Sequence, residues 1–138
     1  ALAPDCRIVG VQSSAAPAAH RAWRTGEPTS DPSRTRVAGL AVGASFALTQ
    51  SILRQSLDDF ILVGDDEILR AVGLMSTHAH TLAEGAGAAS LAGLMADSAR
   101  GSAPGGPCAV ICTGGNADDG ELAGLAGQAG AASLTEAA

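Results

Sequence analysis

The 138-residue sequence contains no lysine and no tyrosine, and all eight of its basic residues are arginine. Without lysine, no side chain can supply the amine that binds an aldehyde as a Schiff base. With only one Trp and two Phe, the core must consist of small aliphatic side chains packed among 18 Gly. The sequence also lacks a run of about 18 apolar residues, so no membrane-spanning helix is expected.

Positive charge is scarce. The net charge is −6 and no arginine cluster forms a stripe, which argues against nucleic acid and against anionic membranes as partners. The chain starts at Ala1 and has no charged stretch followed by an apolar run, so we expect no signal peptide.

The three cysteines are Cys6, Cys108 and Cys112. Their number is odd and their spacing matches no zinc pattern. We interpret them as small buried hydrophobic residues in a reducing compartment, and expect a cytoplasmic protein.

The hydrophobic pattern alternates between short β-branched runs and helical periods. Strands are predicted at residues 7–11, 60–63 and 109–112. Helices are predicted at residues 15–24, with Pro17 in the first turn, at 45–57, from 64 onward, at about 85–98 and from Asp118. Residues 128–138 are expected to be a flexible tail. This order indicates an α/β fold with a parallel sheet flanked by helices. The nearly all-apolar strands are typical of the interior of a larger sheet. We therefore expect that partners of these strands are missing from this chain and that the chain exposes hydrophobic patches.

The segment Thr113-Gly114-Gly115-Asn116 lies between a predicted strand and a predicted helix. Glycines there allow the backbone to approach a ligand, and open α/β sheets bind ligands at the carboxyl ends of strands. An ordinary turn between strand and helix explains the same four residues, and the residues alone favour it.

Two further candidates have simple alternatives. Glu84 precedes a predicted helix, where it either complements the helix dipole or faces a pocket, and without context the first is favoured. His78 and His80 are two residues apart and diverge on a helix, so no metal site is predicted from them.

The order of four segments is more informative than any one motif. One enzyme family has four segments in the same order as this chain, where they are residues 35–43, 57–68, 82–88 and 110–116. Over residues 5–127 the chain resembles the C-terminal part of threonine dehydratases (threonine ammonia-lyases) and serine racemase-like proteins. These are pyridoxal phosphate (PLP) enzymes of the tryptophan-synthase-β fold type. The resemblance implies that residues 1–127 are the C-terminal portion of the large domain of a fold-type II PLP enzyme.

The resemblance also implies roles for individual residues. Thr113 would hydrogen-bond the pyridine nitrogen of PLP, and Gly114 and Gly115 would shape the turn beneath the ring. Asn116 would support that turn, and Glu84 would line the pocket near the ring. The implied reaction removes water from L-threonine or L-serine and yields a 2-oxo acid and ammonia.

Several departures from the family pattern limit what this chain can do. The Schiff-base lysine, the Ser/Asn-Gly-Asn substrate loop and the tetraglycine phosphate loop are absent. Ala38 replaces a usual Asp, and Gln12 stands where some relatives have an acidic cation ligand, so no metal is expected. We therefore expect a fragment of a lyase, inactive alone, that binds PLP only together with a missing N-terminal part.

Two alternatives remain. One is a non-catalytic pseudoenzyme or binding subunit that retains the fold, and the other is an α/β domain with fortuitous turns. For the parent enzyme, the resemblance implies a small amino-acid substrate and a homo-oligomer.

Overall fold

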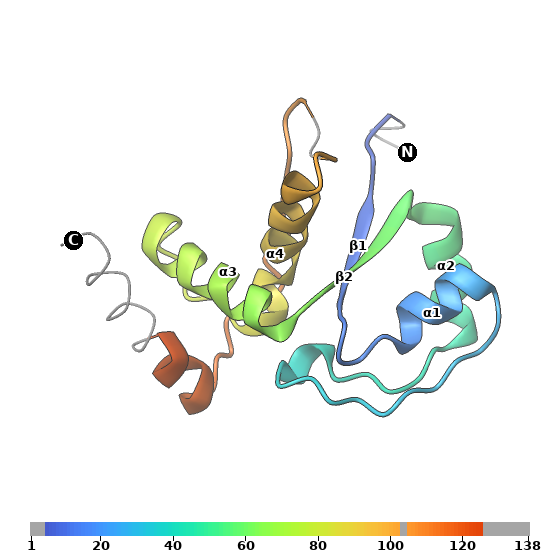
Figure 1. Ribbon diagram of the computed structural model, residues 1–138, viewed down its shortest axis with the longest axis horizontal. Coiled ribbons are helices and arrows are strands. Elements are labelled where there is room, and N and C mark those ends of the chain that lie inside the picture. Colours follow the sequence, from blue (N-terminus) through green and yellow to red (C-terminus); the bar gives the residue numbers. More distant parts are fainter. Residues whose placement is uncertain (1–4, 103–104, 126–138) are drawn as a thin grey trace.

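The computed structural model describes residues 5–102 and 105–125. Helices lie on both sides of a small central sheet (Figure 1). In chain order the elements are β1 (Val9–Ser13), α1 (Ala18–Thr25), a 3₁₀ turn (Ala38–Leu40), α2 (Ala47–Ser56), β2 (Asp59–Val63), α3 (Asp65–His78) and α4 (Gly85–Ala99). Residues 119–125 are also helical. The predicted tail at residues 128–138 lies outside the described residues.

The two strands pair in parallel, with Val9 opposite Asp59 and Ser13 opposite Val63. The chain between them contains α1 and α2, as a parallel connection requires. This confirms the predicted α/β fold with a partial parallel sheet flanked by helices. The first strand was predicted at residues 7–11, but β1 begins two residues later and continues to Ser13. Pro17 precedes α1 as its N-cap residue rather than lying in its first turn.

Neighbouring residues of β2 face opposite sides of the sheet, as the strand period of two requires. The ring of Phe60 packs edge-on against His20 and Trp23 of α1, with ring centroids 5.6 and 6.0 Å apart. Ile61 faces α4, where a Cβ on Gly93 would lie 3.3 Å from its Cδ1 and 2.5 Å from Val11 Cγ2. Glycine at position 93 thus allows α4 to approach the sheet closely.

The core lies between the sheet, α3 and α4. The largest fully buried apolar side chains are Ile68, Val63 and Val72. Small residues of α4 fill the space against them; the buried ones include Ala88, Ala89, Ala92 and Ala96. The core contains few aromatic residues because α4 packs closely against its neighbours through alanine and glycine, which leaves little space for large side chains.

The predicted strand at residues 109–112 is wrong. These residues are extended but have no strand partner in the described part of the chain. They lie against α4, where the Ser90 hydroxyl donates a 2.8 Å hydrogen bond to the carbonyl of Ile111. Ile111 is 68% exposed. Its apolar sequence predicted burial, but no second strand of the described chain lies beside it.

The cysteines were also predicted wrongly. Cys6, Cys108 and Cys112 are all exposed. For Cys108 and Cys112 the error has the same cause as the strand error, because both lie in or beside the extended segment that no sheet covers.

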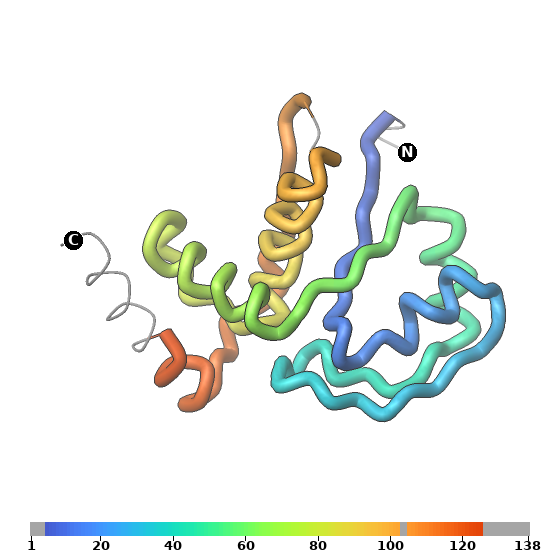
Figure 2. The backbone as a smooth tube through the Cα atoms, viewed as in Figure 1, coloured from blue at the N-terminus to red at the C-terminus, as the bar shows by residue number. Residues whose placement is uncertain are grey.

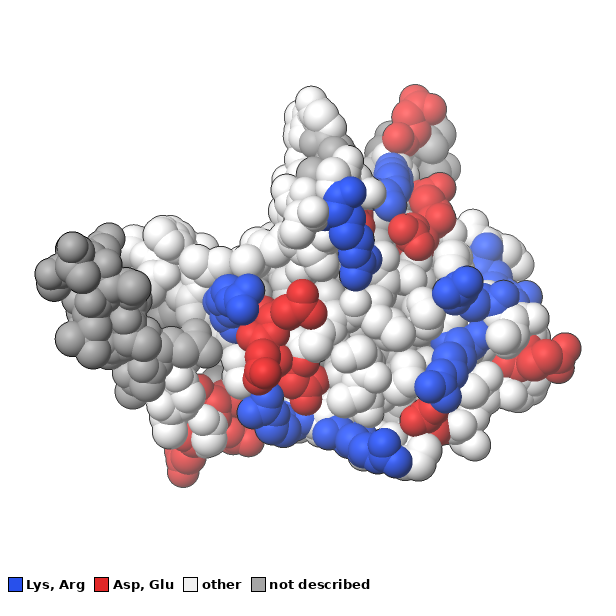
Figure 3. All heavy atoms as spheres, viewed as in Figure 1, with Lys and Arg blue, Asp and Glu red and all other residues white. Residues whose placement is uncertain are grey.

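The surface carries mixed charge and several exposed apolar side chains. On the face shown in Figure 3, arginine and acidic side chains are interspersed and separated by wide uncharged areas. Leu48 and Ile52, one helical turn apart on α2, are 75% and 55% exposed. In the described residues, no helix has the length and apolar character needed to cross a membrane.

Candidate functional site

The turn at residues 113–116 lies against the start of α4. Figure 2 shows the chain returning along α4 before it reaches the final helical residues. The backbone N–H of Glu84 donates a 3.2 Å hydrogen bond to the carbonyl of Gly114. Together with the bond between Ser90 and Ile111, this contact fixes the returning chain at two points along α4. Two segments that the sequence singled out separately, Glu84 and the glycine turn, are therefore adjacent.

Close packing at this contact depends on glycine. A Cβ on Gly114 would overlap the carboxylate of Glu84, and a Cβ on Gly87 would overlap the carbonyl oxygen of Gly114. A Cβ on Gly115 would lie only 2.7 Å from the carbonyl oxygen of Leu82. Glycine at positions 87 and 115 thus allows two backbone segments to approach within a distance that a larger residue would prevent, whereas a side chain at position 114 would displace the Glu84 carboxylate.

Two polar groups remain accessible at this contact. The side chain of Thr113 is exposed, and its hydroxyl makes only a long contact, 3.5 Å, to the carbonyl of Ala86 among the described residues. Glu84 is half-buried and its carboxylate does not cap its own helix. Asn116 is exposed at the end of the turn. The arrangement presents a hydroxyl and a carboxylate on neighbouring backbone segments, where both can hydrogen-bond a ligand.

The start of α4 is capped by a residue that the sequence did not single out. The backbone N–H of Gly85 donates a 2.8 Å hydrogen bond to Oε1 of Glu121, which lies 36 positions along the chain. The other oxygen, Oε2, accepts a 3.3 Å hydrogen bond from the backbone N–H of Asp118. The sequence Asp118-x-x-Glu121 is a capping-box pattern and could have been recognised. The contact with Gly85 depends on tertiary structure and left no local signal.

A second polar cluster lies at the carboxyl ends of the two strands. The carboxylate of Asp65 accepts hydrogen bonds from the hydroxyls of Ser13 and Thr35, at 2.6 and 2.7 Å, and from the backbone N–H of Arg36 at 2.7 Å. Burial by itself would raise the pKa of Asp65. The bonds from Ser13, Arg36 and Thr35, with the Arg36 guanidinium, outweigh burial and hold the pKa of this carboxyl below its usual value.

The Asp65 cluster supports the contact at α4 indirectly. It anchors Thr35 and Arg36, and the next residue, Val37, packs on the start of α4. A Cβ on Gly85 would lie 2.9 Å from Val37 Cγ1, and one on Gly39 would lie 2.6 Å from the Cβ of Ala86. The start of α4 is therefore enclosed by residues 37–39 on one side and by Glu121 and the glycine turn on others.

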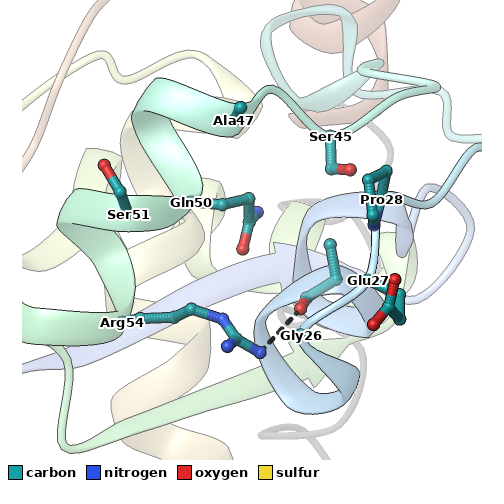
Figure 4. A pocket seen from close by; sticks show the side chains of 9 residues that line it. Gly26, Glu27, Pro28, Ser45, Ala47, Gln50, Ser51 and Arg54 are labelled. Carbon is teal, nitrogen blue, oxygen red and sulfur yellow. Dashed lines mark hydrogen bonds between the residues drawn. The ribbon is translucent and has the colours of Figure 1, made fainter.

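A hollow of about 230 Å³ lies elsewhere, between α1 and α2 (Figure 4). Gln50 and Arg54 of α2 point into the region between the helices, with Ser45 and Pro28 at its border. Arg54 donates to the carbonyls of Ala22 and Trp23 and so caps the end of α1. None of the residues that line this hollow belongs to the glycine turn or to α4.

The described residues contain no group of three or more His, Cys, Asp and Glu side chains arranged to hold a metal ion. His78 lies at the end of α3, and His80 follows it with a positive φ of 52°.

Comparisons with known proteins match most of the chain. The family described as "Pyridoxal-phosphate dependent enzyme" matches residues 1–114. The L-threonine ammonia-lyase of Geobacter sulfurreducens is 34% identical over 116 residues, which cover 83% of this chain and 28% of that protein. A putative threonine dehydratase of Sinorhizobium fredii is 32% identical over 87% of this chain and 36% of its own length. The chain thus spans between about a fifth and about a third of the length of the curated relatives it matches.

Solved structures of similar fold include threonine deaminases. The crystal structure of a T.th. threonine deaminase is 31% identical, with a TM-score of 0.76 over 85% of this chain and 41% of that one. The processed form of threonine deaminase isoform 2 from Solanum lycopersicum has a TM-score of 0.83 over 94% of this chain and 38% of that one. At 24% identity, the Solanum lycopersicum structure supports the fold alone.

Proposed function

Because the chain belongs to the family of pyridoxal-phosphate dependent enzymes, we propose that the contact between the glycine turn and α4 forms one wall of a PLP pocket. The observation that carries this proposal is the exposed Thr113, whose neighbour Gly114 accepts the backbone N–H of Glu84 and packs against its carboxylate. The hydroxyl and the carboxylate thus belong to two backbone segments in direct contact. When bound, the cofactor supplies an electron sink for bond cleavage at the amino-acid α-carbon.

The groups at this wall fit the edge of a pyridine ring. The Thr113 hydroxyl can donate a hydrogen bond to a ring nitrogen, because its only described partner is the distant carbonyl of Ala86. A neutral hydroxyl does not protonate that nitrogen. Glu84 can accept a hydrogen bond from a donor at the ring or on the substrate. Gly114 and Gly115 let the turn pack closely against Glu84 and Leu82, and we propose that Asn116 supports the turn.

The wall is not a whole active site. The sequence contains no lysine, so the amine that holds PLP must come from polypeptide outside these 138 residues. We propose that residues 1–127 are part of the catalytic domain of an ammonia-lyase. Its substrate would be L-threonine or L-serine, which loses water and, after hydrolysis, gives a 2-oxo acid and ammonia. We further propose that this lyase is a cytoplasmic homo-oligomer, and that the 138-residue chain is inactive alone.

One experiment tests the need for an external amine. The 138-residue chain is incubated with PLP and reduced with borohydride, and pyridoxyl groups are mapped by peptide mass spectrometry. We expect no adduct on any internal residue. Chain acetylated at Ala1 serves as the control, because the α-amino group is the one ordinary amine present. A stable adduct at an internal position would contradict the proposal.

A second experiment tests the reaction. The reading frame is extended upstream until it encodes a lysine, and the longer protein is assayed for 2-oxo acid release from L-threonine and L-serine. We expect activity, and a loss of about tenfold or more in Thr113→Ala with retention in Thr113→Ser, because only the alanine removes the hydroxyl. A frame that starts at this chain would instead favour the binding subunit, since no lysine would then be encoded.

A further inference from the structure

The carboxylate of Glu121 stands at the start of two helices. Through Oε1 it accepts the backbone N–H of Gly85, the first residue of α4, at 2.8 Å. Through Oε2 it accepts the backbone N–H of Asp118 at 3.3 Å, just before helical residues 119–125. Asp118 completes the reciprocal pattern, because its Oδ1 accepts the backbone N–H of Glu121 at 2.9 Å. Helix starts carry partial positive charge, so one carboxylate stabilises both.

The Gly85 amide depends on this carboxylate. Gly85 is buried, and Glu84, the residue at the N-cap position of α4, makes no side-chain cap of its own. Glu121 therefore supplies from a distance the acceptor that a cap residue normally supplies locally. If the carboxylate were removed, the N–H would lose its acceptor in a position that water does not readily reach.

The two backbone N–H groups that Glu121 joins lie in α4 and just after the glycine turn that packs against it. One is in α4 directly after Glu84, and the other is two residues after Asn116. Three other hydrogen bonds hold the returning chain on α4 and the residue before it: Ser90 to Ile111 at 2.8 Å, Thr113 to Ala86 at 3.5 Å and Glu84 to Gly114 at 3.2 Å. All three lie on the N-terminal side of Gly115, whereas among the described residues Glu121 supplies the hydrogen bond to α4 on the C-terminal side. The orientation of the C-terminal end of the glycine turn therefore depends on Glu121, and the backbone that carries Thr113 is held from both sides only while that bond is present.

We propose that Glu121 is a positioning residue of the PLP pocket, which holds the glycine turn against α4 so that the Thr113 hydroxyl faces the ring. This inference rests on the proposed function of the wall. Glu121 itself engages two backbone amides and is not expected to touch the cofactor. The same geometry means that the start of α4 already binds a carboxylate, so the cofactor phosphate must bind elsewhere.

The test compares Glu121→Ala, Glu121→Gln and Glu121→Asp in the 138-residue chain, with Asp119→Asn as the matched control. Asp119 is an exposed acid of the same helical segment and makes no hydrogen bond within the described residues. Glutamine keeps an oxygen that can accept from Gly85. Aspartate keeps the charge but is one methylene shorter, so it cannot reach Gly85 and Asp118 together.

Two readouts are measured by NMR without cofactor. Amide hydrogen exchange at Gly85 should accelerate about tenfold or more in Glu121→Ala and Glu121→Asp, and much less in Glu121→Gln. Three-bond couplings should report a single χ1 rotamer for Thr113 in wild type, Glu121→Gln and Asp119→Asn, and rotamer averaging in the other two variants. A residue that merely stabilised the fold would lower the thermal midpoint without selectively changing Thr113.

Unchanged exchange at Gly85 and an unchanged Thr113 rotamer in Glu121→Asp would overturn the proposal. That variant decides the matter if Glu121→Ala fails to fold. The readouts need no PLP, so they separate this inference from the proposed function. If, in the extended protein, Thr113→Ala lost activity and Glu121→Asp did not, the proposed pocket would be supported and the role of Glu121 would be refuted.

Discussion

The carboxylate of Asp65 accepts a 2.6 Å hydrogen bond from the hydroxyl of Ser13, which joins the end of β1 to the first turn of α3. Ser13 is fully buried. The other oxygen of Asp65 accepts the backbone N–H of Arg36. One carboxylate thus connects the sheet, a helix and the segment that leads to the start of α4.

Replacing Asp65 with Asn should destabilise the protein. The carboxylate accepts hydrogen bonds on both oxygens, whereas an amide has one oxygen and one NH₂ group. In either orientation the NH₂ group would replace an acceptor, so either the backbone N–H of Arg36 or the hydroxyls of Ser13 and Thr35 would lose the acceptor they now have. We expect a loss of about 1.5–3 kcal/mol in the free energy of unfolding at neutral pH. Asp66→Asn is the control, because Asp66 pairs with Arg36 in an exposed ion pair worth no more than about 1 kcal/mol. Chemical denaturation of both variants measures the difference, and equal losses would refute this account.

The contribution of Asp65 should also depend on pH. Its pKa is lower in the folded chain than its ordinary value of 3.8, so ionisation favours the folded state. This stabilisation is present above about pH 4 and is lost as pH falls through the lower, folded pKa. The stability difference between wild type and Asp65→Asn should therefore be constant from neutral pH to about pH 5 and shrink in acid.

His20 should make stability fall on mild acidification. Burial lowers the pKa of His20, and the positive charge of Arg24 adds to the effect. Its Nδ1 is buried without a hydrogen-bond partner among the described residues. Because the folded pKa lies below the ordinary 6.5, the unfolded chain binds the proton more readily. Stability is thus full above about pH 6.5 and declines as pH falls through the folded pKa.

Denaturation at pH 7.5 and at about pH 5 measures this slope. His20→Leu should remove much of it, since the titrating group is gone. The control His78→Leu, at the exposed end of α3, keeps His20 and should retain the slope. An identical slope in wild type and His20→Leu would show that other groups cause the acid sensitivity.

A methyl group at position 87 should separate the glycine turn from α4. In Gly87→Ala the new Cβ would overlap the carbonyl oxygen of Gly114, a backbone atom that cannot rotate away. We expect a loss of about 1–3 kcal/mol from overpacking, although alanine is the better helix former. Gly124→Ala is the matched control, because no described atom lies within 4 Å of its Cβ position. Thermal unfolding should show destabilisation in the first variant and neutrality or a small gain in the second.

The alternation of strands and helices could be read from the sequence because each element carries its own signal. Residues 60–63 are all apolar, with β-branched and aromatic side chains among them, and form β2, and the acidic run at 65–67 begins α3 as expected. Residues 109–112 carry the same apolar signal, yet no strand forms there. A strand needs a partner for its backbone groups, and the sequence of one segment does not say whether a partner lies beside it.

The candidate site divides in the same way. Thr113, Gly114 and Glu84 were found because glycine turns and helix starts are local patterns. The contact of Glu84 with Gly114, and the overlap that requires glycine at position 87, follow from packing between segments about 30 residues apart. Glu121 was missed because its bond to Gly85 spans 36 positions.

By itself the sequence determined the α/β class, the positions of most helices and the absence of any lysine amine, since these depend on composition and on local periodicity. Only the tertiary structure decided that the third apolar run has no strand partner among the described residues and that Glu84 contacts the glycine turn at Gly114. It also decided that one carboxylate, Glu121, holds two helix starts together. Those features depend on which distant groups meet, and contacts between distant groups are set by the packing of the whole chain.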